Sequence, residues 1–316
     1  MNKKEILTGI IPDEYGGLRL DNALVKLFPD YSRARIQKWI KNGDATVNGK
    51  NMRPKDVVTG GENVLIDMQL TDEVSFEPEA IALDIVFEDD ELIVINKPAG
   101  LIVHPGAGNP TGTMANALLH HLPEILAVPR VGIVHRLDKD TTGLLVVAKD
   151  LKSHTHLVEQ LQRRMVSRKY IALVYGELIS GGTVDEPIGR HSVDRKRMAV
   201  KPSMGRPAIT HYRIRKKFNG FTLLDVKLET GRTHQIRVHM AHIKFPIVGD
   251  RVYGRKMNAG KNSTLLKLSN FSRQALHAAE LSFIHPKKQS EITFSAPLPE
   301  DFQELIEILE CNQNES

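Results

Sequence analysis

Residues 135–149 read HRLDKDTTGLLVVAK, in which a polar and charged run is followed at once by an apolar one. Gly143 and the two threonines before it permit a turn, and GLLVVAK is typical of a buried strand. Asp138 and Asp140 are therefore expected on a loop that a strand holds in place. A carboxylate on such a loop can act as a nucleophile or a general base, although an isolated H-R-x-D is more often a solvated turn.

Strand-like runs dominate the rest of the second half, and they follow one another more often than they alternate with helices. This order predicts an α+β fold with a large mixed, mostly antiparallel β-sheet flanked by helices and loops. Helices are expected from Met114, over 150–165 and over 301–310. The expected strands are IALDIVF, ELIVINK, KYIALVYGEL, TVDEPIG, ITHYRIRKKF, FTLLDVKLETG and SEITFSAPLP.

The segment 15–60 carries nine Lys and Arg against four Asp, a difference of +5 that equals the net charge of the whole chain. RLDNALVKLF and PDYSRARIQKWIKNG each have a helical apolar period, with Ser32 as an N-cap and Gly43 as a stop for the second helix. ATVNGK predicts a strand and a tight hairpin turn, and NVLIDM a later strand. The segment is therefore expected to form a small domain with a basic helix face.

An acidic stretch with Pro78, residues 69–80, separates the two parts of the chain. We expect an N-terminal extension over 1–15, a small domain over 16–75, a linker over 76–84, a catalytic domain over 85–310 and a flexible C-terminus over 311–316. The segment 254–270 is expected to be an exposed, mobile loop.

Composition excludes several classes of protein. Cys311 is the only cysteine of the 316 residues, so an internal disulfide or a cysteine-based zinc site is excluded, as fits a cytoplasmic protein. No apolar run approaches the length of a membrane span, and the N-terminus does not resemble a signal peptide. His234, His239 and His242 lack metal-ligand spacing, and no glycine-rich phosphate loop is present. The net charge of +5 favours an anionic partner.

Several long motifs together resemble the family of pseudouridine synthases that includes the ribosomal large-subunit enzymes. The resemblance covers nearly the whole chain, and the segment RLDNALVKLFPDYSRARIQKWI with its VNGK turn resembles an S4 RNA-binding domain. The motifs of the second part are INKPAGLIVHPG (95–106), HRLDKDTTGLLVVAK (135–149), SRKYIALVYG (167–176), GGTVDEPIGRH (181–191) and ETGRTHQIRVHMAHI (229–243).

The resemblance implies three catalytic residues. Asp138 would be the catalytic acid, with Asp140 as the next choice, and Tyr170 would stack on the uracil and take the C5 proton late in the reaction. Arg232 would pair with Asp138, with Arg237 as the second choice, because such a pair keeps a carboxylate charged and aimed. Thr233 is the expected N-cap of the helix that carries Arg237.

Further residues are expected to support this site or to bind RNA. Arg136 would bind the RNA backbone or support the loop, and Leu137 and Ile236 would wall the pocket. The basic segments 190–202 and 213–217 are expected to contact the backbone, with affinity that falls with salt. The expected RNA-binding residues are Arg19, Ser32, Arg33, Arg35, Gln37, Lys38, Lys41, Lys97, Arg195, Lys196 and Arg197.

The implied reaction breaks the N1–C1′ bond of uridine, rotates the base and forms a C5–C1′ bond. Asp138 could attack C1′, promote a glycal or add to C6, and the sequence leaves these routes open. The uridine must be flipped and water excluded, and neither a metal nor an organic cofactor is needed.

The resemblance implies 23S rRNA as the substrate, at the loop of helix 69, and nothing calls for a dimer, so we expect a monomer. The alternatives are another rRNA site, tRNA, a non-catalytic S4-type assembly factor, or a glycosidase that releases uracil.

Overall fold

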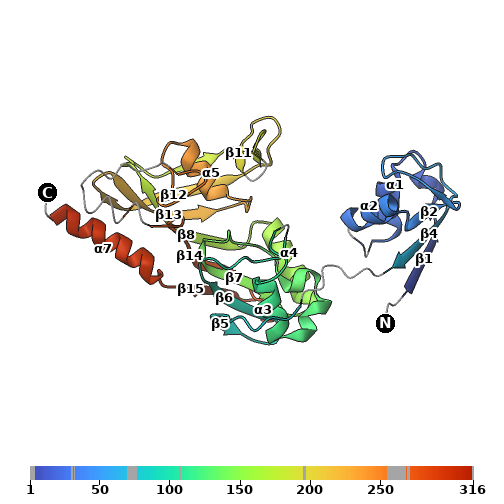
Figure 1. Ribbon diagram of the computed structural model, residues 1–316, viewed down its shortest axis with the longest axis horizontal. Helices are drawn as coiled ribbons and strands as arrows, with labels where there is room; N and C mark the ends of the chain where they lie inside the picture. The colour runs from blue at the N-terminus through green and yellow to red at the C-terminus, as the bar shows by residue number, and fades with distance from the viewer. Residues whose placement is uncertain are drawn as a thin grey trace. The chain divides into compact units, whose positions relative to one another are not determined.

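The computed structural model describes residues 4–29, 31, 33–69, 77–106, 108–194, 197–254, 268 and 271–314. The chain divides into two compact units, Met1–Ser75 and Phe76–Ser316, which are described one at a time (Figure 1). Within the described ranges, no helix combines the length and the apolar character that a membrane crossing needs.

The first unit packs two helices on a small antiparallel sheet. The helices are α1 (Leu20–Leu27) and α2 (Arg33–Asn42). The sheet has the order β1-β4-β2-β3. Its strands are β1 (Lys4–Ile10), β2 (Ala45–Val47), β3 (Lys50–Asn51) and β4 (Asn63–Gln69). Both predicted helices and the hairpin are present, and the residues set aside as an extension supply β1, which pairs with β4 along its whole length.

Local sequence explains this arrangement. Leu20, Leu24, Ile36 and Ile40 are buried on the facing sides of the two helices, as the helical period predicts. α2 ends before Gly43, whose φ of +84° favours glycine. The predicted N-cap Ser32 lies outside the described residues.

A buried carboxylate joins the two helices of this unit. Asp21 on α1 accepts hydrogen bonds from Arg33 Nη2 (2.8 Å) and Gln37 Nε2 (2.6 Å) of α2 and from Arg19 Nε (3.1 Å). The Asp21 side chain is fully buried, whereas Arg19 and Arg33 are about half exposed. Burial alone would raise the pKa of Asp21, but the hydrogen bonds from Arg33, Gln37 and Arg19 outweigh it and lower the pKa to about 2.

Asp21→Asn is expected to lower the free energy of unfolding of the first unit by about 2 kcal/mol at pH 7. Because the folded pKa lies below the ordinary 3.8, ionisation of Asp21 stabilises the fold above pH 4, and this contribution disappears as the pH falls toward 2. Trp39, the only tryptophan of the chain, is buried in this unit, so its fluorescence during urea denaturation of the full chain reports the change. Asp44→Asn is the matched control, and equal urea midpoints for both variants would contradict the prediction.

The second unit is built on a nine-stranded sheet with the order β5-β6-β7-β14-β8-β13-β12-β9, and β15 pairs with β14. Among the strand pairs of the described residues, only β14 and β7 run parallel, so the predicted mixed, mostly antiparallel sheet is confirmed. The strands are β5 (Ile85–Glu88), β6 (Leu92–Lys97), β7 (Thr142–Ala148), β8 (Ser167–Tyr175), β9 (Gly182–Asp185), β12 (Ile209–Phe218), β13 (Phe221–Leu228), β14 (Leu276–Ile284) and β15 (Glu291–Ser295). β10 (Ile188–Arg190) and β11 (Met198–Val200) form a separate two-stranded sheet.

Helices flank both ends of this sheet (Figure 1). α3 (Met114–His121) and α4 (Leu151–Gln162) lie with β5 to β7, and α5 (Gln235–His242) lies by β11 and β12. α7 (Glu300–Asn314) packs on β12. The predicted N-cap of α5 was wrong by one residue, because His234, with a φ of +56°, occupies that position instead of Thr233. The predicted loop 254–270 lies, apart from Gly254 and Leu268, outside the described residues.

The strand predicted from GLLVVAK forms the base of the Asp138 loop. Every residue of β7 is buried. Gly143 has a φ of +109°, and a Cβ there would lie 2.2 Å from the carbonyl oxygen of Ala278 on β14. Only glycine fits this approach, so the loop is fixed against the centre of the sheet.

Candidate active site

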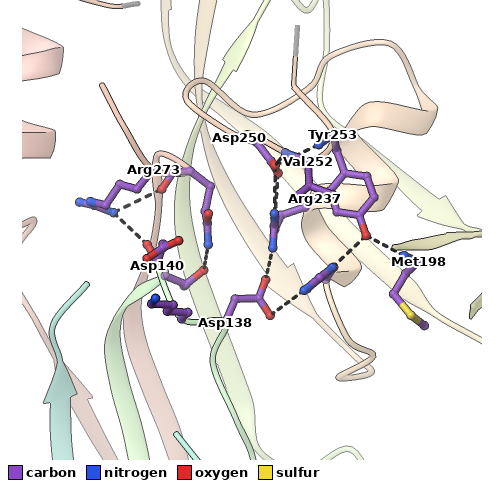
Figure 2. A network of polar contacts seen from close by, with 12 residues as sticks. Asp138, Asp140, Met198, Arg237, Asp250, Val252, Tyr253 and Arg273 are labelled. Atoms are coloured by element: carbon purple, nitrogen blue, oxygen red, sulfur yellow. Dashed lines mark hydrogen bonds and ion pairs between the residues drawn. The ribbon is translucent and has the colours of Figure 1, made fainter. Parts of the chain in front are cut away.

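The loop 138–141 is held by two segments, one near the beginning and one near the end of the sequence of the second unit. Gln274 Nε2 donates to Thr141 Oγ1 (3.0 Å), and the backbone N–H of Gly100 donates to the carbonyl of Lys139 (3.0 Å). Arg273 Nη1 contacts the carbonyl oxygen of Asp140 at 3.5 Å (Figure 2). Asp138 therefore stands on the rigid loop that its sequence predicts.

Lys97 was predicted to bind RNA, and the structure shows instead that it is fully buried. Its Nζ donates to the carbonyl oxygens of Pro98 (2.7 Å), Leu101 (3.0 Å) and Lys139 (2.8 Å). Burial lowers its pKa to about 8, against the opposing effect of Asp140 and Asp138. Lys97 ties the loop before α3 to the Asp138 loop, and it has no surface to offer to RNA.

Arg237 connects two carboxylates in the centre of the site (Figure 2). Its Nη1 donates to Asp138 Oδ2 at 2.9 Å, and its Nε and Nη2 donate to Asp250 at 2.7 and 3.0 Å. The side chains of Arg237 and Asp250 are 6% and 0% exposed. Burial would raise the pKa of Asp250, but the hydrogen bond from Arg237 outweighs it and lowers this pKa. The guanidinium is thus fixed on one side, and its free edge aims Asp138.

The first choice for the arginine beside Asp138 was wrong, and the second choice occupies that position. Arg232 Nε donates to the carbonyl of Pro207 at 3.2 Å, and its backbone N–H donates to Gln235 Oε1 at 3.0 Å. Arg232 precedes α5 and is a half-buried part of the cavity wall, whereas the first turn of α5 places the buried Arg237 against Asp138.

His234 and Tyr253 complete this network, and neither was predicted as a site residue. His234 Nε2 lies 3.8 Å from Asp138 Oδ1, and its Nδ1 lies 2.8 Å from the Tyr253 hydroxyl. That hydroxyl accepts a hydrogen bond from the N–H of Met198 on β11 (2.8 Å), which leaves its own proton for His234 Nδ1. Burial lowers the pKa of His234, so a neutral ring with its Nε2–H toward Asp138 satisfies all three groups.

A cavity of about 610 Å³ opens over Asp138, a size typical of ligand sites. Tyr170, Leu137 and Ile236 line it and are buried, and Arg136 lines it and is exposed, so the predicted neighbours meet around one space. Burial raises the pKa of Tyr170, a shift that nearby Arg168 opposes and Asp138 reinforces.

His135, the first residue of the quoted stretch, supports the fold. Its Nε2 accepts a hydrogen bond from the N–H of Val146 on β7 at 3.1 Å. Burial, assisted by the charge of Arg168, lowers its pKa to about 3. His135 is therefore neutral with its Nε2 lone pair occupied, and it fixes the start of the Asp138 loop on β7.

The remaining predicted RNA-binding residues are scattered. Lys38 and Lys41 are exposed on α2, and Arg19, Arg33 and Gln37 are held by Asp21. Arg197 lies over the Tyr253 ring, 5.4 Å from its centroid. Ser32, Arg195, Lys196 and the side chain of Arg35 lie outside the described residues. RNA binding by these residues stays a prediction.

In the part of the chain that the structure describes, one group of side chains has the composition of a metal site: Asp89, Glu91 and His285. His285 Nε2 is 2.7 Å from Asp89 Oδ2, and its Nδ1 accepts from the N–H groups of Lys287 and Lys288. Both ring nitrogens are thus occupied, and the Lys287 ammonium lies 2.8 Å from Glu91. These side chains satisfy one another without an ion.

Comparison with known proteins agrees with this geometry. Residues 91–242 match the RNA pseudouridylate synthase family, and residues 18–64 match the S4 domain. The chain belongs to the RNA pseudouridylate synthase family, and it is an enzyme of the isomerase class.

Particular relatives extend the likeness over the full length. The chain is 53% identical over 319 residues to ribosomal large subunit pseudouridine synthase D of Escherichia coli O6:H1, covering 100% of this chain and 98% of that protein. The protein of the same name in Xanthomonas campestris pv. campestris is 52% identical over 95% of this chain and 91% of its own length. The solved structure of human RNA pseudouridylate synthase domain containing 4 is 29% identical, with a TM-score of 0.56 over 72% of this chain and 92% of that chain.

Proposed function

We propose that this enzyme converts uridine to pseudouridine in 23S rRNA, at the loop of helix 69. The single observation that carries the proposal is the Asp138 carboxylate, held over a nucleotide-sized cavity by Arg237 at 2.9 Å. The names of the relatives with more than half of the sequence in common support the large ribosomal subunit as the substrate. An exposed RNA loop suits the chemistry, because its bases can be turned outward.

The site supplies what an isomerisation of uridine requires. Asp138 acts on the flipped nucleotide as the N1–C1′ bond breaks and its electron pair remains on the base. The base turns, C5 bonds to C1′, the proton leaves C5 and N1 gains a proton, so that no atom is lost or added. Attack at C1′, glycal formation and addition to C6 all begin from the carboxylate that Arg237 aims. Tyr170 takes the C5 proton in each case; because burial raises the pKa of its phenol, it does so while it passes its own hydroxyl proton on to the base.

The cavity wall favours isomerisation over release of free uracil. Glu229 is the other carboxylate that lines the cavity. It is held by Arg164 (2.8 Å) and His211 (2.7 Å), so it is not poised to activate water. The buried Asp138–Arg237–Asp250 network argues against a non-catalytic assembly factor. Burying these charges costs desolvation free energy, and a protein without catalytic activity would gain nothing from it.

Pseudouridine mapping of 23S RNA tests the proposal. RNA from cells that lack this protein is treated with carbodiimide and read by primer extension, after complementation with wild type or with an Asp138→Asn variant. We expect the marks in the helix 69 loop to vanish without the protein and to return only with wild type. Marks that persist there while others vanish would contradict the proposed site but keep the chemistry.

A further inference from the structure

Arg168 is a buried cation without a counter-ion in the described part of the chain. It lines the cavity and is 7% exposed. Its Nη2 donates a long hydrogen bond to the carbonyl oxygen of Glu229, at 3.4 Å. Its Nε is buried with no hydrogen-bond partner among the described residues. Arg237, by contrast, is equally buried but has two carboxylates.

An arginine in this state is unfavourable for the free protein. Removing a guanidinium from water costs several kcal/mol unless an opposite charge and hydrogen bonds replace the lost hydration. Burial accordingly lowers the pKa of Arg168. Buried unsatisfied polar groups are rare in folded proteins, and those that persist are candidates for ligand contact.

The residues around Arg168 leave space for its guanidinium at the cavity wall. Arg168 lies on β8 two residues before Tyr170, so both side chains leave the strand on the same face. A Cβ on Gly231 would lie 2.6 Å from Arg168 Nη1, so a larger residue in the turn before α5 would displace the guanidinium. Arg168 lowers the pKa of Tyr170 and Asp138 raises it, so one positive and one negative group lie near the phenol.

We propose that Arg168 binds a phosphodiester group of the RNA beside the flipped uridine. This inference rests on the proposed function, because it requires an RNA strand at the cavity. Uridine itself is neutral, so the phosphodiester is the permanent anion that RNA can bring to a buried guanidinium. The planar fork of arginine matches two phosphate oxygens at once. The same contact satisfies Nε and replaces the missing counter-ion.

The experiment compares Arg168→Met and Arg168→Lys with wild type on a transcript of the helix 69 stem–loop. Dissociation constants are measured at several KCl concentrations, and single-turnover rates at saturating enzyme. We expect Arg168→Met to weaken binding about 10-fold and to reduce the slope of log K against log salt by about 0.7 to 0.9, the value for one lost phosphate contact. Arg168→Lys restores the slope, because it restores the charge.

Lys169→Met is the matched control. Lys169 is the next cation on the same strand, lies on the opposite face and pairs with Glu280 at 2.6 Å. Lys169→Met should leave the slope of log K against log salt unchanged. Arg168→Met should also raise the urea midpoint of the second unit, followed by circular dichroism, since an apolar side chain replaces an unpaired charge; a lowered midpoint would mean a structural role.

Two results would overturn the inference. One is an unchanged salt slope with a slower single turnover, which would assign Arg168 to Tyr170 or the base. The other is an unchanged slope with an unchanged rate. A wild type that binds the transcript without forming pseudouridine would count against the proposed substrate alone, because the salt slopes still test the contact.

Discussion

Asp138→Asn abolishes pseudouridine formation, with an expected fall in single-turnover rate on the order of 10⁴-fold or more, as for other residues at the centre of a catalytic unit. Asparagine has the size of aspartate but lacks the negative charge, so it cannot attack a carbon or stabilise a cationic centre at C1′. The fold should survive, because Arg237 keeps its two hydrogen bonds to Asp250. Binding of the helix 69 transcript should change little. The measurement is single-turnover formation of pseudouridine.

Asp140→Asn is the control for this variant. Asp140 is two residues away on the same loop and is absent from the cavity lining. We expect it to retain activity within about 10-fold. If Asp140→Asn were inactive and Asp138→Asn active, the register of the site would be wrong by two residues.

Arg237→Met is expected to produce the second largest loss of catalytic rate. It leaves Asp138 without its guanidinium and leaves Asp250 buried and unpaired, which costs about 3–5 kcal/mol in stability. The single-turnover rate should fall about 10²- to 10³-fold, the range for loss of one preorganised electrostatic partner. A urea titration followed by circular dichroism measures the first effect, and single-turnover kinetics at a temperature where the variant is folded measures the second.

Arg232→Met separates the two arginines that the sequence offers. Arg232 is half-buried and its side chain contacts only a carbonyl oxygen among the described residues, so its removal should weaken RNA binding by less than about 10-fold and leave stability nearly unchanged. A double variant, Arg237→Met with Asp250→Leu, should recover part of the lost stability, since it removes the unpaired carboxylate as well. It should not recover activity. Equal losses for Arg232→Met and Arg237→Met would refute the pairing observed here.

Local patterns were sufficient for most of the fold. α1, α2 and the turn at Asn48-Gly49 follow from apolar period and turn chemistry, and β7 from a continuous apolar run. The cap of α5 was misplaced, because His234 adopts a left-handed conformation that its side-chain partners across the fold stabilise. That contact joins residues of different segments, and no local propensity encodes it.

The sequence predicted most of the residues of the site but not how they are arranged around Asp138. Asp138 and Tyr170 come from motifs, and their catalytic roles stay predictions until they are tested. Arg232 and Arg237 occupy one motif and differ only in the direction that the turn before α5 gives them. Lys97 was assigned to RNA binding, and the burial of its ammonium could not be predicted, because folding alone brings its three carbonyl partners together.

The parallel pairing of β14 with β7 also determines when a newly synthesised chain can form its catalytic loop. The loop of Asp138 is anchored by Gln274 and by the approach of Gly143 to Ala278, more than 130 residues later in the sequence. At the usual pace of translation, roughly 10 s separate the synthesis of the two segments. The first unit, formed by residues 1–75, has been synthesised before that interval begins. A chain still attached to the ribosome can therefore fold its first unit well before it has a functional catalytic loop, and modification starts only after residue 278 has emerged.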